Sequence, residues 1–319
     1  MKLNLAWMAG LALAATCNLG VAQSEKPLTI VVPTAAGGGN DAMARTIGQK
    51  LGVLLNRSVI VENKAGANGA LAAEFVARAN PDGNTLMFGY VATHSMNPAL
   101  QKLRYDPIKD FEAIGRVGYS PTVMVINTTV KAKDVKDLIK VMKEKPDAFS
   151  FASAGNGTAP HFTAELFKIA TQTQPLHIPY KGSAPAITDT IGGQTQLMFP
   201  SLFTALPYIK SGKLNALAIA GSKRSQVLPN VPTLKEQGVD GVDVEQWYGF
   251  FAPAKTPKDV IAKLNQSLNM ALADPEIIKR IEGHGADVEA STPEQLAELV
   301  KNDLQKWKTV VQRAKLQVD

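Results

Sequence analysis

Short apolar runs alternate with glycine-rich turns and amphipathic stretches along most of this 319-residue chain. Near the N-terminus, "LTIVVPT" predicts a short buried strand, and "SVIVEN" and "TLMFGY" predict two further strands. Helical spacing of apolar residues predicts helices over 42–54 and 70–79, between those strands. Strands that alternate with helices are typical of an α/β sheet with parallel strands.

The same alternation continues to the C-terminus. Further strands are predicted from "TVMVIN", "FSFAS", "LHIPY", "TQLMFPS", "LNALAIAG" and "WYGFFAP". Helices are expected over 135–145, 162–171, 257–273 and 293–314, with "GADVEA" as a short strand between the last two. A strand, a glycine-rich turn and a helix follow one another near residue 37 and again near residue 155. Two similar lobes that face each other would bring two helix N-termini to one cleft, which suits an anion.

The first residues resemble a secretory signal peptide. Lys2 supplies a positive start, and the apolar stretch over 5–15 is too short to span a bilayer. "GVAQS" provides small residues before a cleavage site, so we expect export and cleavage after Ala22. Lipidation at Cys17 is the alternative, but it is less favoured because Thr16 stands where a smaller residue is expected.

Composition and charge narrow the function classes. The chain is 45% hydrophobic and 19% charged, as in globular proteins, and its formal net charge is +6. The charges are scattered, without a Lys/Arg block, so nucleic-acid binding is not expected, whereas a diffuse positive field favours small anions. The single cysteine lies in the predicted signal peptide, so no disulfide or metal thiolate is expected in the mature chain.

Four loops follow predicted strands at their carboxyl ends, where open α/β sheets bind ligands. They are "TAAGGGND", "ATHS", "SAGNGTAPH" and "PYKGS". The first loop matches neither a dinucleotide fingerprint nor a Walker loop. Its bare backbone N–H groups suit a carboxylate or phosphate oxygen, and a plain tight turn is the alternative. Each loop alone could be a simple connection, but four at one edge predict a binding site.

Catalytic and metal-binding arrangements are not evident. The histidines are not spaced as ligands on one helix face, and no nucleophile elbow occurs. Asp41 could act as a base, but a helix cap is the favoured interpretation. We expect His177 to be a satisfied strand residue and His284 to lie at a helix end, while Lys181 could pair with an anion or be solvated. No enzyme activity, metal or cofactor is predicted.

A set of ordered motifs then identifies a family. The motifs include "IVVPTAAGGGNDAMAR", "VIVENKAGANG", "THSMNPAL", "SFASAGNGTAPHFTAELF", "HIPYKGSAPAITDTIGGQTQLMF" and "WYGFFAPAKTP". Over nearly the whole mature chain, the sequence resembles the Bug family, the extracytoplasmic solute-binding proteins of tripartite tricarboxylate transporters.

This resemblance implies an α/β fold, that of a two-lobed, type II-like periplasmic binding protein with its ligand cleft between the lobes. Lobe 1 would comprise residues 23–122 and 249–319, and lobe 2 residues 123–248. The hinge would lie near 118–123 and 245–249. The ligand would be a small organic acid, often a dicarboxylate, on which the lobes close.

Site residues are carried over from the family motifs and combined with polar neighbours of the loops. The predicted ligand-binding residues are Thr34, Ala35, Ala36, Gly37, Gly38, Gly39, Asp41, Thr93, His94, Ser95, Ala154, Gly155, Asn156, Gly157, Thr158, His161, Tyr180 and Ser201. Many family members have Asp-Asn where this chain has Pro200 and Ser201. The missing acidic group disfavours amino acids as ligands.

The resulting expectation is a monomeric periplasmic protein that captures a small organic acid for membrane transporter subunits. A ligand-sensing protein that docks on a membrane kinase is the first alternative. An exported enzyme of small acids is the second, and it lacks a nucleophile–base pair in the sequence.

Overall fold

A computed structural model describes residues 26–314 and 316, so the predicted signal peptide, its cleavage site and Cys17 lie outside the described residues. The strands are β1 Leu28–Val32, β2 Val59–Asn63, β3 Thr85–Tyr90, β4 Phe111–Asn127, β5 Ser150–Ser153, β6 Leu176–Pro179, β7 Leu197–Met198, β8 Leu214–Ala220, β9 Glu245–Pro253 and β10 Asp287–Val288. The α-helices are α1 Gly39–Leu55, α2 Ala70–Ala77, α3 Asn97–Leu100, α4 Val135–Glu144, α5 Ala159–Thr171, α6 Ser183–Ile191, α7 Leu202–Lys210, α8 Lys258–Leu272, α9 Pro275–Glu282 and α10 Pro293–Ala314. A π-helix, η2 Ala92–Met96, leads directly into α3, and short 3-10 turns occur at η1 Ala67–Gly69, η3 Pro146–Ala148 and η4 Lys235–Gln237.

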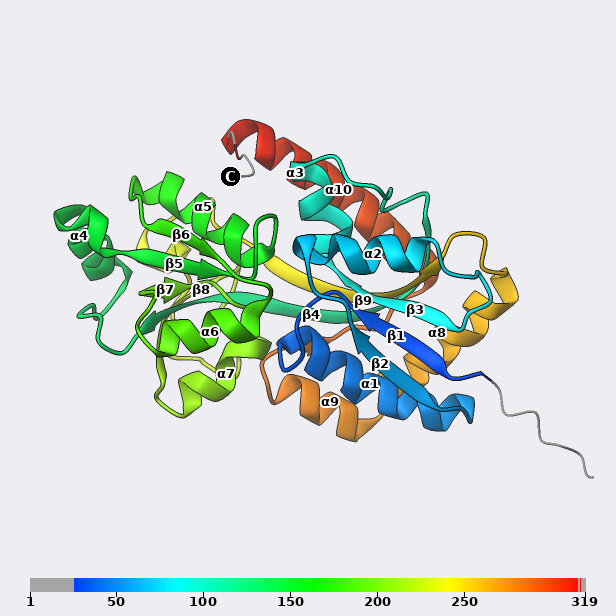
Figure 1. Cartoon of the computed structure of the whole chain (residues 1–319). Coiled ribbons are helices and arrows are strands. Elements are labelled where there is room, and N and C mark those ends of the chain that lie inside the picture. The colour runs from blue at the N-terminus through cyan, green and yellow to red at the C-terminus, as the bar shows by residue number, and fades with distance from the viewer. Residues whose placement is uncertain (1–25, 315, 317–319) are drawn as a thin grey trace, which may run out of the picture.

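Two lobes share one continuous sheet (Figure 1). Lobe 1 contains β1 to β3, β9 and β10 with helices α1 to α3 and α8 to α10, and lobe 2 contains β5 to β8 with α4 to α7. The strand order is β2-β1-β3-β9-β4-β7-β5-β6, and β8 and β10 also pair with β4. The predicted two-lobed α/β class is therefore confirmed, and β4 runs through both lobes.

The sheet is mixed. β1 pairs in parallel with β2 and β3, and β5 pairs in parallel with β6 and β7, as the alternation of strands and helices predicts. The prediction of parallel strands is wrong for β4, β8 and β9, which form antiparallel pairs. β4 and β9 connect the lobes, whereas β8 pairs with the lobe 2 part of β4.

β4 is much longer than the strand predicted from "TVMVIN", which is only its last part. Along its first part β4 pairs with β9 as far as Pro121 opposite Glu245, and from Thr122 opposite Ala220 it pairs with β8. Two bulges and two glycines interrupt the apolar alternation in the first part, so the sequence pattern misses it. Helix α7 and the start of α9 are not predicted by the sequence pattern, whereas the helix end expected at His284 is confirmed as the end of α9.

Apolar cores hold the strands whose ends carry the predicted loops. In lobe 1, Phe88 stacks on Tyr248 and meets Phe250 edge-on, and in lobe 2 Phe167 packs against Phe199. Burial of each such ring contributes on the order of 1.5–3 kcal/mol. The glycine loops follow β1 and β5, η2 follows β3, and the "PYKGS" segment follows β6, so all four loops lie at carboxyl ends of strands as predicted. None of the helices within the described residues is long and apolar enough to cross a membrane.

Candidate functional site

The first glycine loop joins β1 to α1. Helix α1 begins at Gly39 with Gly38 as its N-cap, in an extended conformation and without a side-chain cap. The predicted helix cap at Asp41 is therefore wrong, because the helix begins earlier than expected. The Asp41 carboxylate instead reaches back and accepts a hydrogen bond from the Gly37 N–H at 2.9 Å.

The other bonds of Asp41 fix the loop to lobe 1. Its Oδ1 accepts from Arg45 Nε at 2.9 Å and from Asn63 Nδ2 at 3.0 Å, and Asn63 Nδ2 also donates to the Thr34 carbonyl at 3.1 Å. Burial raises the pKa of Asp41, but the hydrogen bonds from Arg45, Gly37 and Asn63 together bring this pKa below its ordinary value. The carboxylate is thus ionised and engaged by protein groups, so it shapes the loop.

The second glycine loop joins β5 to α5, whose N-cap is Thr158. The Thr158 hydroxyl donates to the Gly155 carbonyl at 2.6 Å, and Gly157 N–H donates to His161 Nδ1 at 3.2 Å. Burial, with smaller effects from His177 and Lys168, lowers the pKa of His161 to about 3. A neutral imidazole keeps an acceptor nitrogen for the loop.

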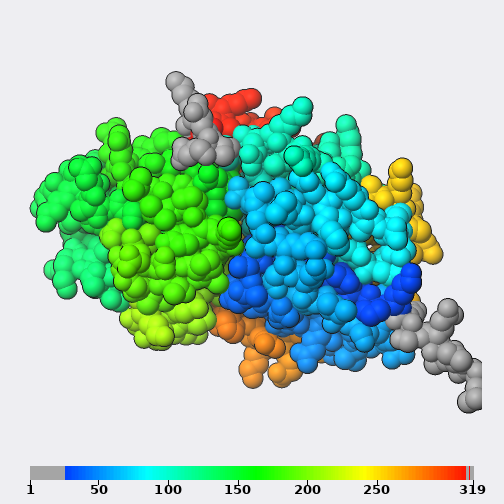
Figure 2. Space-filling view, in the orientation of Figure 1, coloured from blue at the N-terminus to red at the C-terminus, as the bar shows by residue number. Residues whose placement is uncertain are grey.

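The two lobes meet closely at these loops, and Figure 2 shows the green lobe against the blue and cyan lobe along a closed seam. A Cβ on Gly155, where φ is +120°, would lie 2.5 Å from Asn68 Oδ1 of lobe 1. A Cβ on Gly182, after β6, would lie 3.3 Å from the Ala35 nitrogen. Glycine at both positions lets the lobe 2 backbone approach the Asn68 side chain and the Ala35 backbone of lobe 1.

A cavity of about 50 Å³ lies between the lobes at this seam. Its lining consists of residues 33–34, 66–69, 90, 154 and 180–182, without a carboxylate among them. Lys181 is the cation of that set. Within the described residues, Thr34 Oγ1 and, on the second loop, Asn156 Oδ1 are buried and have no hydrogen-bond partner. Buried polar atoms in native proteins normally have partners, so Thr34 Oγ1, which belongs to a residue of the lining, points to a polar occupant of this cavity. Asn156 is not among the lining residues.

Comparison with known proteins decides the family. Residues 43–316 match the family model described as tripartite tricarboxylate transporter family receptor. The chain belongs to this receptor family.

Solved structures agree with this assignment. This receptor is similar to the periplasmic binding protein BugD, with 37% identity, a TM-score of 0.89 and coverage of 92% of this chain and 99% of that one. It is similar to MatC of Rhodopseudomonas palustris, solved with bound malate, at 34% identity, a TM-score of 0.87 and coverage of 90% and 99%. A second R. palustris protein, solved with adipate, has 28% identity, a TM-score of 0.89 and coverage of 92% and 99%. The resemblance to the Bug family is thereby confirmed.

Some predicted site residues of this receptor line the cavity. Thr34, Ala154 and Tyr180 do so. The Tyr180 hydroxyl donates to Asp189 Oδ2 at 2.7 Å, and burial, followed by this bond, raises the Tyr180 pKa to about 12. Ser201 instead caps α7, where its hydroxyl accepts from the Thr204 N–H at 3.4 Å.

The residues of η2 lie deeper in lobe 1. The His94 ring stacks on Phe251 with centroids 3.8 Å apart, its Nδ1 is 2.9 Å from Thr93 Oγ1, and burial lowers its pKa to about 3. Thr93 lies behind the cavity wall, because a Cβ on Gly69 would be 2.7 Å from Thr93 Cγ2. Ser95 is fully buried as well. A direct ligand contact from η2 therefore stays a prediction. In the structure, Thr93 packs behind Gly69, a residue of the cavity wall.

Sequence reasoning missed the contribution of the "KAGANG" turn, residues 64–69. Asn68 in this turn adopts a left-handed conformation with φ 57°, and residues 66–69 line the cavity. The turn follows β2, so the rule that ligands bind at carboxyl ends of strands could have included it. Lys181 and Gly182 of the "PYKGS" loop also line the cavity, although the sequence predicts no ligand contact for Gly182 and leaves Lys181 either paired with an anion or solvated.

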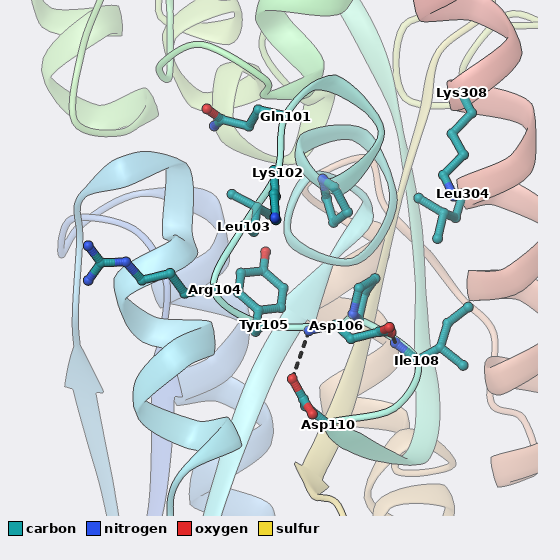
Figure 3. A pocket seen from close by; sticks show the side chains of 12 residues that line it. Gln101, Lys102, Leu103, Arg104, Tyr105, Asp106, Ile108, Asp110, Leu304 and Lys308 are labelled. Atoms are coloured by element: carbon teal, nitrogen blue, oxygen red, sulfur yellow. Dashed lines mark hydrogen bonds between the residues drawn. The ribbon is translucent and has the colours of Figure 1, made fainter.

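A separate surface hollow of about 550 Å³ lies on lobe 1 between the segment 98–110 and α10 (Figure 3). Its lining mixes cations such as Arg104 and Lys308 with Asp106 and Asp110. Asp110 Oδ2 accepts from the Asp106 N–H at 2.7 Å within a local turn. Because the mixed charges belong to one lobe alone, closure of the lobes would not enclose a ligand there.

Proposed function

We propose that this receptor captures a small organic acid, in particular a dicarboxylate, between its lobes in the periplasm. It would then deliver the ligand to the membrane subunits of a tripartite tricarboxylate-type transporter. Membership of the receptor family supports this role. Two similar proteins were solved with malate and adipate, which are both dicarboxylates.

The observation that carries the proposal is the chemistry of the interlobe cavity. Its walls are backbone-rich loops from both lobes, with Lys181 and no carboxylate among the lining residues. Ala154, directly before the Gly155–Thr158 turn that leads into α5, lines this cavity, and the start of α1 lines the neighbouring hollow between the lobes. Helix N-termini carry the positive end of the helix dipole, which adds to the preference of this region for anions. Such a site favours negative charge and excludes cations.

The proposed ligand contacts come from the loops of both lobes. On lobe 1 we assign ligand contacts to residues Thr34 to Gly39. Asp41 and residues Thr93 to Ser95 would hold that loop in position. On lobe 2 we assign Ala154 to Thr158, Tyr180 and Ser201, with His161 as support for its loop. We add Asn68 and Lys181 from the cavity lining.

Ligand binding would be coupled to closure. We place lobe 1 at residues 23–122 and 249–319 and lobe 2 at 123–248. The change of partner strand between Pro121 and Thr122 of β4 supports a hinge there. A ligand that contacts both lobes only in the closed form shifts the population toward that form. We also propose a monomeric protein exported by cleavage after Ala22, which lowers the formal net charge from +6 to +5 by removal of Lys2.

A thermal-shift screen of residues 23–319 tests this function. The panel contains malate, adipate, citrate, aspartate and the neutral diester dimethyl malate. A ligand at one hundred times its Kd adds about 2.7 kcal/mol to the free energy of unfolding. We expect dicarboxylates to raise Tm and the diester to have no effect, with aspartate weaker than malate. A panel without any stabilising carboxylate would contradict the proposal.

A further inference from the structure

A second hollow between the lobes lies beside the start of α1. It has a volume of about 200 Å³, four times that of the cavity at the glycine loops. Lobe 1 contributes the end of α9 and the start of α1, where the Gly37–Gly39 turn is shared with the loop assigned above to the dicarboxylate, and lobe 2 contributes α6 and α7. In Figures 1 and 2 the orange α9 meets the yellow-green α7 region along the lower edge of the seam. At about 30 Å³ of liquid volume per water molecule, the hollow has room for a small organic molecule.

One wall of this hollow is apolar. Phe203 and Pro207 of α7 and Ile187 of α6 line it from lobe 2. The Phe203 ring faces the His284 ring of lobe 1, with centroids 5.4 Å apart. Aromatic rings at such a wall favour a flat apolar body over a strongly hydrated one.

The rim of the hollow is cationic. Arg280, at the end of α9, lines it and makes no side-chain ion pair or hydrogen bond within the described residues. No carboxylate belongs to the lining. The nearby Asp41 is engaged by Gly37 and Arg45. An unpaired guanidinium beside an apolar wall is suited to bidentate recognition of a carboxylate.

We propose that this hollow is an accessory site for a small aromatic monocarboxylate. The carboxylate would bind the Arg280 guanidinium, and the Thr204 and Tyr208 side chains of α7 line the same hollow. The aromatic ring would lie against Phe203 and Pro207. A dicarboxylate is disfavoured there, because its second charge would face the apolar wall without a partner.

Binding at this site is coupled to dicarboxylate binding at the glycine-loop cavity. The coupling rests on the proposed function, whereas the accessory site does not. Both lobes form the walls of both sites. Each ligand therefore makes its full set of contacts in the same closed form. Under this arrangement an aromatic acid and a dicarboxylate strengthen each other's binding, by the same factor in each direction.

Calorimetric titration of residues 23–319 with benzoate tests the site, with benzamide as the uncharged analogue. We expect saturable benzoate binding and none by benzamide. Arg280→Gln weakens benzoate binding by about tenfold or more, because a charge-assisted contact is lost. Lys279→Gln is the matched control, since Lys279 is the neighbouring cation on α9 and does not line the hollow. Ala184→Leu, which narrows the hollow from α6, weakens benzoate binding without changing charge.

A second titration separates this site from the proposed cleft. Benzoate binding that persists or strengthens in saturating malate supports the accessory site, and Arg280→Gln then keeps wild-type affinity for malate. Three results would each overturn the site: loss of benzoate binding in saturating malate, unchanged benzoate affinity in Arg280→Gln, and no benzoate binding at millimolar concentration. Absence of malate binding would overturn the proposed function and leave the benzoate result to stand on its own.

Discussion

Gly39, the first residue of α1, and Thr204, in the first turn of α7, meet so closely across the lobe interface that a Cβ on Gly39 would lie 2.2 Å from Thr204 Oγ1. The contact joins the start of a lobe 1 helix to the start of a lobe 2 helix. Because this contact crosses the lobe interface, a substitution at Gly39 tests closure directly; the same Cβ would lie 3.3 Å from Cδ1 of the buried Phe203 ring.

Gly39→Ala should weaken malate binding by about tenfold or more, because the added methyl separates the lobes in the closed form. The fold of each lobe should stay intact, which far-UV circular dichroism checks. Gly192→Ala is the matched control, since Gly192 lies outside the proposed site and its Cβ would meet only the Thr188 and Asp189 oxygens at an ordinary 3.5 and 3.6 Å. Adding Thr204→Ala to Gly39→Ala should recover affinity, and failure to recover it would show that the clash is not the cause.

Gly155→Ala should abolish the thermal shift caused by a dicarboxylate. Its Cβ would lie 2.5 Å from Asn68 Oδ1, and the left-handed backbone adds strain of about 1–2 kcal/mol. Gly212→Ala isolates the strain, because Gly212 has φ +68° and no atom within 4 Å of the added Cβ. Equal ligand shifts in the two variants would argue against a close approach of the lobes at Gly155.

Asp41→Asn should lower the free energy of unfolding by about 1–3 kcal/mol at neutral pH and weaken ligand binding. It removes a charge that Arg45 and the Gly37 N–H engage. The folded pKa of Asp41 is lowered, so its stabilising effect is complete above the unfolded value near 3.9 and is lost as pH falls through the folded value. Urea unfolding should therefore show the variant approaching the wild type in strong acid. The exposed Asp240→Asn is the control.

Buried histidines should make the protein acid-sensitive. Burial lowers the pKa of His94 and of His161 to about 3, whereas the unfolded value is near 6.5. The unfolded chain binds more protons between these values, so stability falls as pH drops from about 6.5 toward 3. Each histidine contributes at most about 1.4 kcal/mol per pH unit.

His161→Gln provides the measurement. Glutamine can keep an acceptor for the Gly157 N–H but does not titrate. Chemical denaturation across that pH range should show that the free energy of unfolding falls less steeply with decreasing pH in the variant. The difference in slope should correspond to at most one proton bound on unfolding. An unchanged slope would mean that His161 does not stay neutral in the folded protein.

Much of the fold was predictable because local patterns agree with it. The β1–loop–α1 and β5–loop–α5 units combine an apolar run, glycines and an amphipathic helix, so each is visible within a short window. β4 was not, since bulges at Ala113–Gly115 and Arg116–Gly118 interrupt its alternation. The start of α1 was misplaced because the Gly38 backbone, rather than an Asp41 side chain, occupies the cap.

The candidate site was predictable only as a set of loops. The carboxyl-end rule found Thr34 and Tyr180, which line the cavity. It could not show that Gly155 meets Asn68 or that Gly182 meets Ala35, because these contacts depend on how two lobes dock. Nor could it place the His94 ring against Phe251 in the core of lobe 1, since burial of a polar side chain follows from long-range packing.

Calorimetric titration of residues 23–319 with malate and then adipate tests the central claim most directly. The account predicts saturable binding of one dicarboxylate per chain, lost in Gly155→Ala and kept in Gly212→Ala. No saturable heat with either acid, or binding by Gly155→Ala equal to that of the wild type, would contradict a carboxylate site between the lobes.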